Sequence, residues 1–159
     1  MKESLKAAMT TSISEVLETM FFMTIEATED TEWTDLTDST AYGENLFASK
    51  IDFKGPLSGT FFLMVPERIL SGMTEMFMGL EEREVTETHL SGTILEAINI
   101  IAGNTFSKLD DQTVFNLEIP ESVEAGSLSS IAQSAGKEII FFRIETPGGN
   151  LGLLLLYTL

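Results

Sequence analysis

The most informative stretch of the sequence is residues 89–109, HLSGTILEAINIIAGNTFSKL. Residues on a helix advance by about 100° each, so apolar side chains at helical spacing form one face. The apolar side chains at this spacing are those of Leu95, Ile98, Ala102, Phe106 and Leu109. The pattern predicts one long amphipathic helix whose apolar face packs on the core.

Two polar residues, Glu96 and Asn99, stand at the border of this apolar stripe. They are three residues apart and therefore neighbours on the helix surface. Gly92 and Gly103 lie on the same line, one turn to either side, and each costs roughly 1 kcal/mol against alanine inside a helix. The pattern favours a polar pair that another backbone approaches closely. Two alternatives stay open: the pair is ordinary solvated surface, and Gly103-Asn104 is a C-cap that ends the helix.

The composition argues against several classes of function. The 159 residues fit a single domain, 1–159. With 25 acidic and 9 basic residues the formal net charge is −16, so we expect no nucleic acid partner and no anionic membrane surface. The absence of cysteine excludes thiolate chemistry and disulfides. The only histidine, His89, stands at a helix start, so we expect no metal site, no cofactor-binding site and no Ser-His-Asp triad.

Targeting signals are not expected either. The N-terminal residues 1–18 are too polar for a signal peptide. The apolar runs FFLMV (61–65) and LGLLLLYTL (151–159) are too short to span a bilayer. These features predict a cytoplasmic protein without a membrane partner.

The rest of the chain predicts two further helices and five strands. The helices are expected at 2–23 and from Pro66 to Gly79, and Thr86 or Thr88 is expected to cap the helix of residues 89–109. The strands are expected at 47–53, 59–65, 115–119, 138–145 and 151–159. Residues 24–45, in which Trp33 is a candidate anchor to the body, and 121–136 are expected to be connections.

The resulting order is α-β-β-α-α-β-β-β, which predicts an α+β layered domain. A mainly antiparallel sheet is expected to be covered by two long helices and one short helix. The strands at 59–65 and 151–159 are apolar on both faces, so they are expected inside a sheet or at an interface.

The order of these elements resembles the CheX-type members of the CheC/CheX/FliY chemotaxis phosphatases. The matching features are Gly-x-Leu-Ser-Gly at 55–59, Pro66-Glu67 after an apolar strand, Met78-Gly79 ending a short helix, and Glu96-x-x-Asn99-x-x-x-Gly103-Asn104. The opening helix and the terminal strand hairpin also fit, so the resemblance covers nearly the whole chain and implies a CheC-like layered domain.

The resemblance implies a phosphatase that removes the phosphoryl group from the aspartyl-phosphate of a CheY-like response regulator. Glu96 would pair with the active-site lysine of the regulator, and Asn99 would orient the attacking water. The Mg²⁺ would belong to the regulator, so the chain needs no cofactor of its own. Relatives of this type pair edge strands, which implies a homodimer through the sheet, with LGLLLLYTL or its neighbour as the pairing strand.

Three positions depart from the family pattern. Gly92 stands where an Asp or Ser often precedes the Glu by four residues, Pro120 is slightly closer to Asn99 than the usual proline, and the first helix carries Glu15-x-x-Glu18 instead of a second Glu-x-x-Asn. Gly92 keeps an alternative open, a non-catalytic module of the same fold that binds a regulator as a scaffold.

Overall fold

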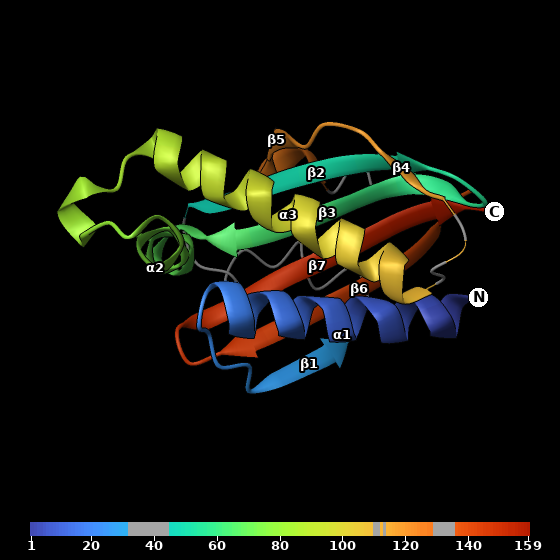
Figure 1. Cartoon of the computed structure of the whole chain (residues 1–159), viewed down its shortest axis with the longest axis horizontal. Coiled ribbons are helices and arrows are strands. Elements are labelled where there is room, and N and C mark those ends of the chain that lie inside the picture. The colour runs from blue at the N-terminus through green and yellow to red at the C-terminus, as the bar shows by residue number, and fades with distance from the viewer. Residues whose placement is uncertain (32–44, 110–111, 113, 129–135) are drawn as a thin grey trace.

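One twisted antiparallel sheet organises the molecule in the computed structural model, which describes residues 1–31, 45–109, 112, 114–128 and 136–159 (Figure 1). Its seven strands run in the spatial order β1-β6-β7-β3-β2-β4, with β5 also paired to β2. The strands are β1 (Ala27–Asp30), β2 (Leu46–Lys54), β3 (Ser58–Pro66), β4 (Asn116–Leu117), β5 (Glu121–Glu124), β6 (Glu138–Thr146) and β7 (Gly149–Thr158).

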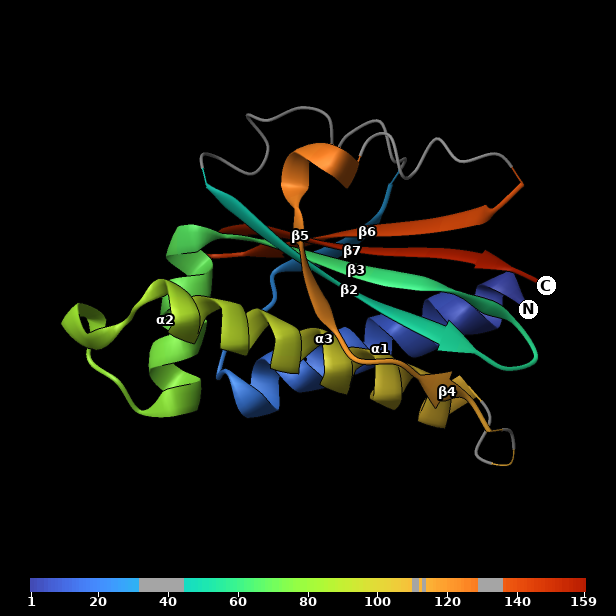
Figure 2. The same ribbon diagram turned by 90° about the horizontal axis from the view of Figure 1, so that it is seen from above.

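The helices lie on one face of this sheet and at its end (Figures 1 and 2). They are α1 (Lys2–Met20), α2 (Glu67–Met78) and α3 (Glu87–Leu109), with the short 3-10 turns η3 (Glu82–Glu84) and η4 (Ala125–Ser127). The structure therefore confirms the α+β layered fold with two long helices and one short helix. None of the described helices is long and apolar enough to cross a bilayer.

The main core lies between the helices and the sheet. It joins fully buried side chains of α1, such as Met9 and Leu17, to those of α3 and the inward face of the strands. Four phenylalanine rings close the core at the C-terminal end of α3, where Phe106 stacks on Phe115 at 4.1 Å and meets Phe53 at 4.6 Å. This aromatic contact fixes the end of α3 against β2 and the segment before β4.

The opposite face of the sheet carries a second, smaller apolar cluster. Phe62, Met64, Phe141 and Leu154 are buried there, and Leu128, after η4, packs with them. Because β3 and β7 are buried on both faces, their continuous apolar sequences are explained by an interior position in the sheet.

The motif at 55–59 has a structural explanation in two close contacts, of β3 with β7 at Gly59 and of the preceding turn with Phe115 at Gly55. A Cβ on Gly59 would overlap the Leu156 carbonyl and lie 2.8 Å from Tyr157 Cα. A Cβ on Gly55 would meet the ring of Phe115 at 2.9 Å. Only glycine lets these backbone segments pack at this distance, so the motif serves the fold.

The sequence predictions about strands are corrected in part. The short strands β1 and β5 lie in segments predicted to be connections. The expectation that 151–159 lies inside a sheet is confirmed, because β7 pairs with β3 on one side and β6 on the other, and for the same reason β7 is not the strand that pairs a dimer. Trp33 lies outside the described residues.

Candidate functional site

Helix α3 begins at a capping box that involves the only histidine. Thr86 Oγ1 accepts a hydrogen bond from the His89 backbone N–H at 3.3 Å, and His89 Nδ1 accepts one from the Thr86 backbone N–H at 3.2 Å. The predicted cap at Thr86 is therefore confirmed, and His89 takes the part that Glu or Gln plays in the usual capping box. The helix continues to Leu109, so the alternative of a C-cap at Gly103-Asn104 is wrong.

The buried face of α3 is centred differently from the predicted stripe. Leu95 and Leu109 are only partly buried. The fully buried side is centred near Ile94 and Ile101, and includes Thr105. The full set of buried residues is Leu90, Thr93, Ile94, Ala97, Ile98, Ile101, Ala102, Thr105 and Phe106.

This shift moves Glu96 away from the core. Glu96 follows Ile94 by two residues and Asn99 precedes Ile101 by two, which is about 200° around the helix in each case. Glu96 therefore points outward, opposite the buried centre, whereas Asn99 is half-buried and only about 20° from the buried Phe106, so it stands at the border of the buried face as predicted.

The Glu96 and Asn99 side chains are both available to a partner. Glu96 is exposed and Asn99 is half-buried. Neither side chain makes a hydrogen bond or ion pair with any residue that the structure describes. Residues three apart on a helix have Cβ atoms about 5–6 Å apart, so the carboxylate and the amide can contact neighbouring groups of one docked surface.

Two buried hydroxyl groups hold α3 from behind. Ser49 Oγ of β2 donates to the Ile94 carbonyl at 3.2 Å, and Ser12 Oγ of α1 donates to the Ile101 carbonyl at 2.9 Å. Both serines are fully buried, so each bond is made away from water. Sequence analysis missed these residues, although a serine within the apolar face of the first helix was an available signal for Ser12.

A third hydroxyl contact joins α2 to α3. Thr74 Oγ1 donates to Thr93 Oγ1 at 2.9 Å, and Thr93 Oγ1 donates to the His89 carbonyl at 2.9 Å. Together with the serine contacts, this bond fixes the rotation of α3 against α1, α2 and β2. The direction of Glu96 and Asn99 is thereby set by the packed side of the helix.

Both glycines of the motif have room for a Cβ atom. An added Cβ would meet only Met78 Cε at 3.6 Å from Gly92, and only Leu117 Cδ1 at 3.8 Å from Gly103. Neither glycine has a positive φ. Neither packing against the described residues nor backbone conformation therefore explains why these positions are glycine.

Three cations that could offset the acidic net charge locally are each engaged within the chain. Arg68 donates to the Gly148 carbonyl, Arg83 pairs with Glu81 at 2.9 Å, and Lys108 pairs with Glu15 at 3.0 Å. The last pair also shows that Glu15 of the Glu15-x-x-Glu18 segment is used to join α1 to α3.

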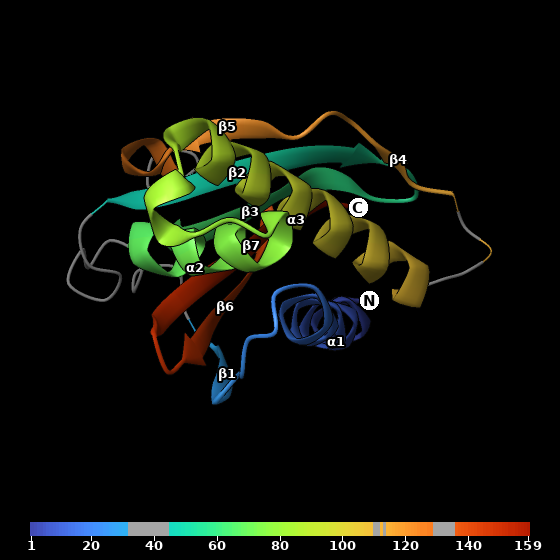
Figure 3. The ribbon, with the colours of Figure 1, turned by 60° about the vertical axis from the view of Figure 1, so that its left-hand side comes forward.

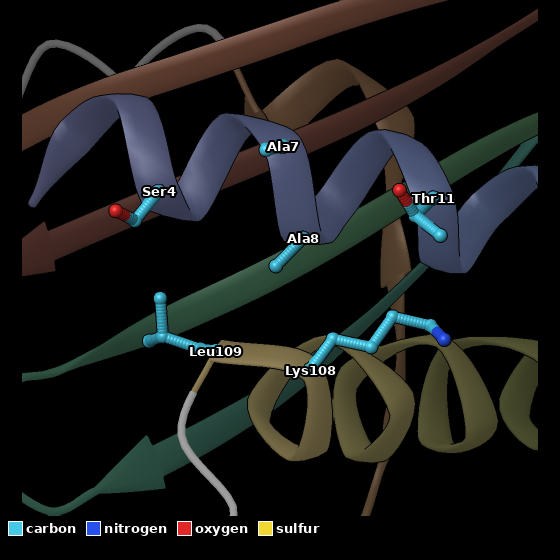
Figure 4. A pocket seen from close by; sticks show the side chains of 6 residues that line it. All are labelled: Ser4, Ala7, Ala8, Thr11, Lys108 and Leu109. Atoms are coloured by element: carbon cyan, nitrogen blue, oxygen red, sulfur yellow. The ribbon is translucent and has the colours of Figure 1, made fainter.

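A shallow groove lies between α1 and the last turn of α3 (Figure 4). Its lining is Ser4, Ala7, Ala8, Thr11, Lys108 and Leu109. Lys108 follows Asn99 by nine residues, about 180° around the helix, so this groove opens on the other side of α3 from the polar pair. Among the described residues no three His, Cys, Asp or Glu side chains gather in a way that would hold a metal ion.

Comparison with known proteins identifies the class. The family model described as "Chemotaxis phosphatase CheX" matches residues 47–145. No curated protein sequence matches the chain.

Solved structures share the fold at low sequence identity. A CheC-like superfamily protein from Shewanella sp. PV-4 aligns with a TM-score of 0.74 at 15% identity, covering 99% of both chains. The CheX-CheY-BeF3-Mg complex from Borrelia burgdorferi aligns with a TM-score of 0.72 at 14% identity, over 96% of this chain and 97% of that one. The chemotaxis protein CheX from Vibrio vulnificus gives 0.71 at 14% identity, over 97% and 96%. The fold is thus that of the CheC-like proteins.

Because the family model matches more than half of its length, the chain belongs to the CheX family of chemotaxis phosphatases. The matched range includes β2 from its second residue, β3, α2 and all of α3, and therefore the polar pair.

Proposed function

We propose that this protein hydrolyses the aspartyl-phosphate of a CheY-like response regulator. The observation that carries the proposal is the pair on α3: Glu96 points outward and Asn99 stands half-buried beside it, both without partners in the described chain, on a helix fixed on its buried side. The Borrelia relative, whose fold is similar, is in complex with CheY, beryllofluoride and magnesium.

The chemistry requires positioning more than reactive groups. Water attacks the phosphorus of the regulator's phosphoaspartate, the P–O bond to the aspartyl oxygen breaks, and inorganic phosphate and the free carboxylate result. The Asn99 amide both donates and accepts hydrogen bonds, so it can hold this water in line. The Glu96 carboxylate would pair with the regulator's lysine and set the docking register. The Mg²⁺ would be held by the regulator.

The test is the decay of a phosphorylated CheY-like regulator from the same host. We expect the wild-type protein to accelerate decay, and Asn99→Ala and Glu96→Ala to lose most of the acceleration. Asn104→Ala is the matched control, because this amide is on the same helix but about 140° away from Asn99. If Asn104→Ala loses as much activity as Asn99→Ala, the pair is not the site.

The second candidate is a docking module that binds the regulator without hydrolysis. Gly92 favours it, since this position lacks the Asp or Ser side chain of the motif. Binding of the regulator with no acceleration of decay by the wild-type protein would select this candidate.

We also propose that the protein forms a homodimer by pairing sheet edges. The described edges are β1 on one side and β4 with β5 on the other. Pairing through β1 leaves α3 free, and the β1 acids are already neutralised, Glu29 by Arg143 and Asp30 by Lys6 at 2.7 Å. Sedimentation at micromolar concentration should give a dimer, and a monodisperse monomer would contradict the proposal.

A further inference from the structure

Exposed apolar side chains flank the polar pair at two places. Apart from the two terminal residues, the large exposed apolar residues described are Phe22, Met76, Phe77, Met78, Val114 and Ile119. Two of them, Met78 and Ile119, are placed next to the outward face of α3. Their exposed fractions are 38% and 84%.

Met78 borders the pair on the N-terminal side. It is the last residue of α2, which contacts α3 (Figure 3). Its Cε lies 3.6 Å from the position of a Cβ on Gly92, and Gly92 is one turn before Glu96. The end of α2 therefore continues the surface that carries Glu96.

Ile119 borders the pair on the side of the sheet edge. The segment from Phe115 to Pro120 runs along α3 towards its N-terminus (Figure 2): Phe115 stacks on Phe106 and Leu117 lies beside Gly103. The register on β2 shifts by one residue between Leu117, opposite Phe53, and Glu121, opposite Lys50, so regular alternation ends after Leu117. Ile119 lies in the short segment between these two pairings, and its side chain is exposed. Two further residues advance at most about 6.6 Å, which places Ile119 beside the turns of α3 between Gly103 and Asn99.

Charge alone gives this protein little attraction for a phosphorylated receiver. The net charge is −16, and Arg83 and Lys108 are already paired with carboxylates. Docking on an acidic phosphorylation pocket must then draw on apolar burial, which is insensitive to the sign of charge. An interface of about 800 Å² per partner is a disc about 32 Å across, and the span from Gly92 to Gly103 is about 16 Å, so both flanks fall inside it.

We infer that Met78 and Ile119 are the apolar anchors on which the phosphorylated receiver domain docks, one on either side of Glu96 and Asn99. This inference rests on the proposed function, since it names further contacts for the same partner. The receiver must present apolar side chains around its acidic pocket to match them.

The test measures binding of the host receiver domain loaded with Mg²⁺ and beryllofluoride. We expect Ile119→Ser and Met78→Ser each to raise Kd about tenfold, the size expected when a buried apolar anchor is truncated. Met78→Leu should keep a Kd close to the wild-type value, because it retains an apolar side chain at the end of α2. Val114→Ser is the matched control: Val114 is 74% exposed but alternates to the side opposite Phe115, so its Kd should equal the wild-type value.

A second readout separates this inference from the proposed function. If the wild-type protein accelerates phosphoaspartate decay, the two serine variants should raise KM and leave kcat at saturation unchanged. Wild-type acceleration combined with serine variants that match Val114→Ser would overturn the inference and leave the proposed function standing. A wild-type protein that binds the receiver but does not hydrolyse its phosphoaspartate would refute the proposed function. The Kd values of the two serine variants relative to the wild type would still show whether Met78 and Ile119 contact the receiver.

The remaining outcome concerns a different occupant. If Ile119→Ser and Met78→Ser change the association state of the protein itself, and leave receiver binding unaltered, the surface serves a second copy of the chain and the inference is wrong. Thermal melts accompany each variant; because Ile119 is largely exposed, its replacement should leave the melting temperature unchanged.

Discussion

Replacing Gly92 and Gly103 by alanine is expected to make the protein more stable and less active. Each new Cβ would meet a single methyl group, at 3.6 Å and 3.8 Å, which is ordinary van der Waals contact. Because glycine costs about 1 kcal/mol relative to alanine inside a helix, the double variant should gain about 2 kcal/mol in its free energy of unfolding. With an unfolding entropy of about 2.1 cal/mol/K per residue, this corresponds to a rise of about 6 °C in Tm for a chain of this length.

Activity should move in the opposite direction. The two methyl groups would project from the same side of α3 as Glu96 and Asn99, where a docked receiver brings its own backbone close. We therefore expect KM for the phosphorylated regulator to rise, although the fold is more stable. Calorimetry and decay assays on the same preparations measure both effects.

Gly72→Ala supplies the matched control. Gly72 lies within α2, and an added Cβ there has nothing within 4 Å. This variant should gain about 1 kcal/mol, as any open helical glycine does, and retain wild-type KM. If the α3 double variant gains stability and keeps wild-type KM, the glycines do not serve close approach, and that part of the reasoning is refuted.

Three further predictions concern the frame that holds the site. Gly59→Ala should lower the free energy of unfolding by at least about 3 kcal/mol in urea titrations, because its Cβ would overlap the β7 backbone; wild-type stability would refute the close-packing argument. His89→Glu should raise the free energy of unfolding by about 0.5 kcal/mol by completing a more usual capping box, whereas His89→Ala should lower it. Equal melting temperatures of the two variants would contradict this prediction. Stability should also fall at alkaline pH. Hydrogen bonding to Asp30 raises the pKa of Lys6, and burial raises the pKa of Tyr157. For both groups the pKa of the folded state lies above that of the unfolded state, so the protonated form is favoured by folding. Their contribution to the free energy of unfolding is therefore complete below about pH 10 and is lost as the pH rises through the pKa values of the folded state. Asp30→Asn should reduce the part of the alkaline loss of stability that comes from Lys6. An unchanged dependence of stability on pH in this variant would show that the Lys6–Asp30 pair does not contribute.

The sequence predicted the long elements because each has a clear apolar period. The helices and the strands β2, β3, β6 and β7 were all placed within a few residues. It missed β1 and β5, whose sequences ATED and ESVE show little apolar alternation. These strands form by pairing with β6 and β2, so their stability comes from a neighbour that is distant in the chain.

The rotation of α3 was predicted imperfectly for a different physical reason. Thr93 and Thr105 are fully buried, yet as hydroxyl residues they were not counted as part of the apolar stripe. Each satisfies its hydroxyl on a carbonyl four residues earlier, at 2.9 and 2.8 Å, so burial leaves no polar group unpaired. Most of the error comes from buried apolar residues that the predicted stripe left out, namely Leu90, Ile94, Ala97 and Ile101, which move its centre towards Ile94 and Ile101.

Asn99 and Glu96 are expected to have different roles, and steady-state kinetics on the phosphorylated regulator separate these roles. If Asn99 orients the attacking water, Asn99→Ala should lower kcat about 100-fold and leave KM near the wild-type value. If Glu96 docks the regulator, Glu96→Ala should mainly raise KM. Wild-type kcat in Asn99→Ala would contradict the account.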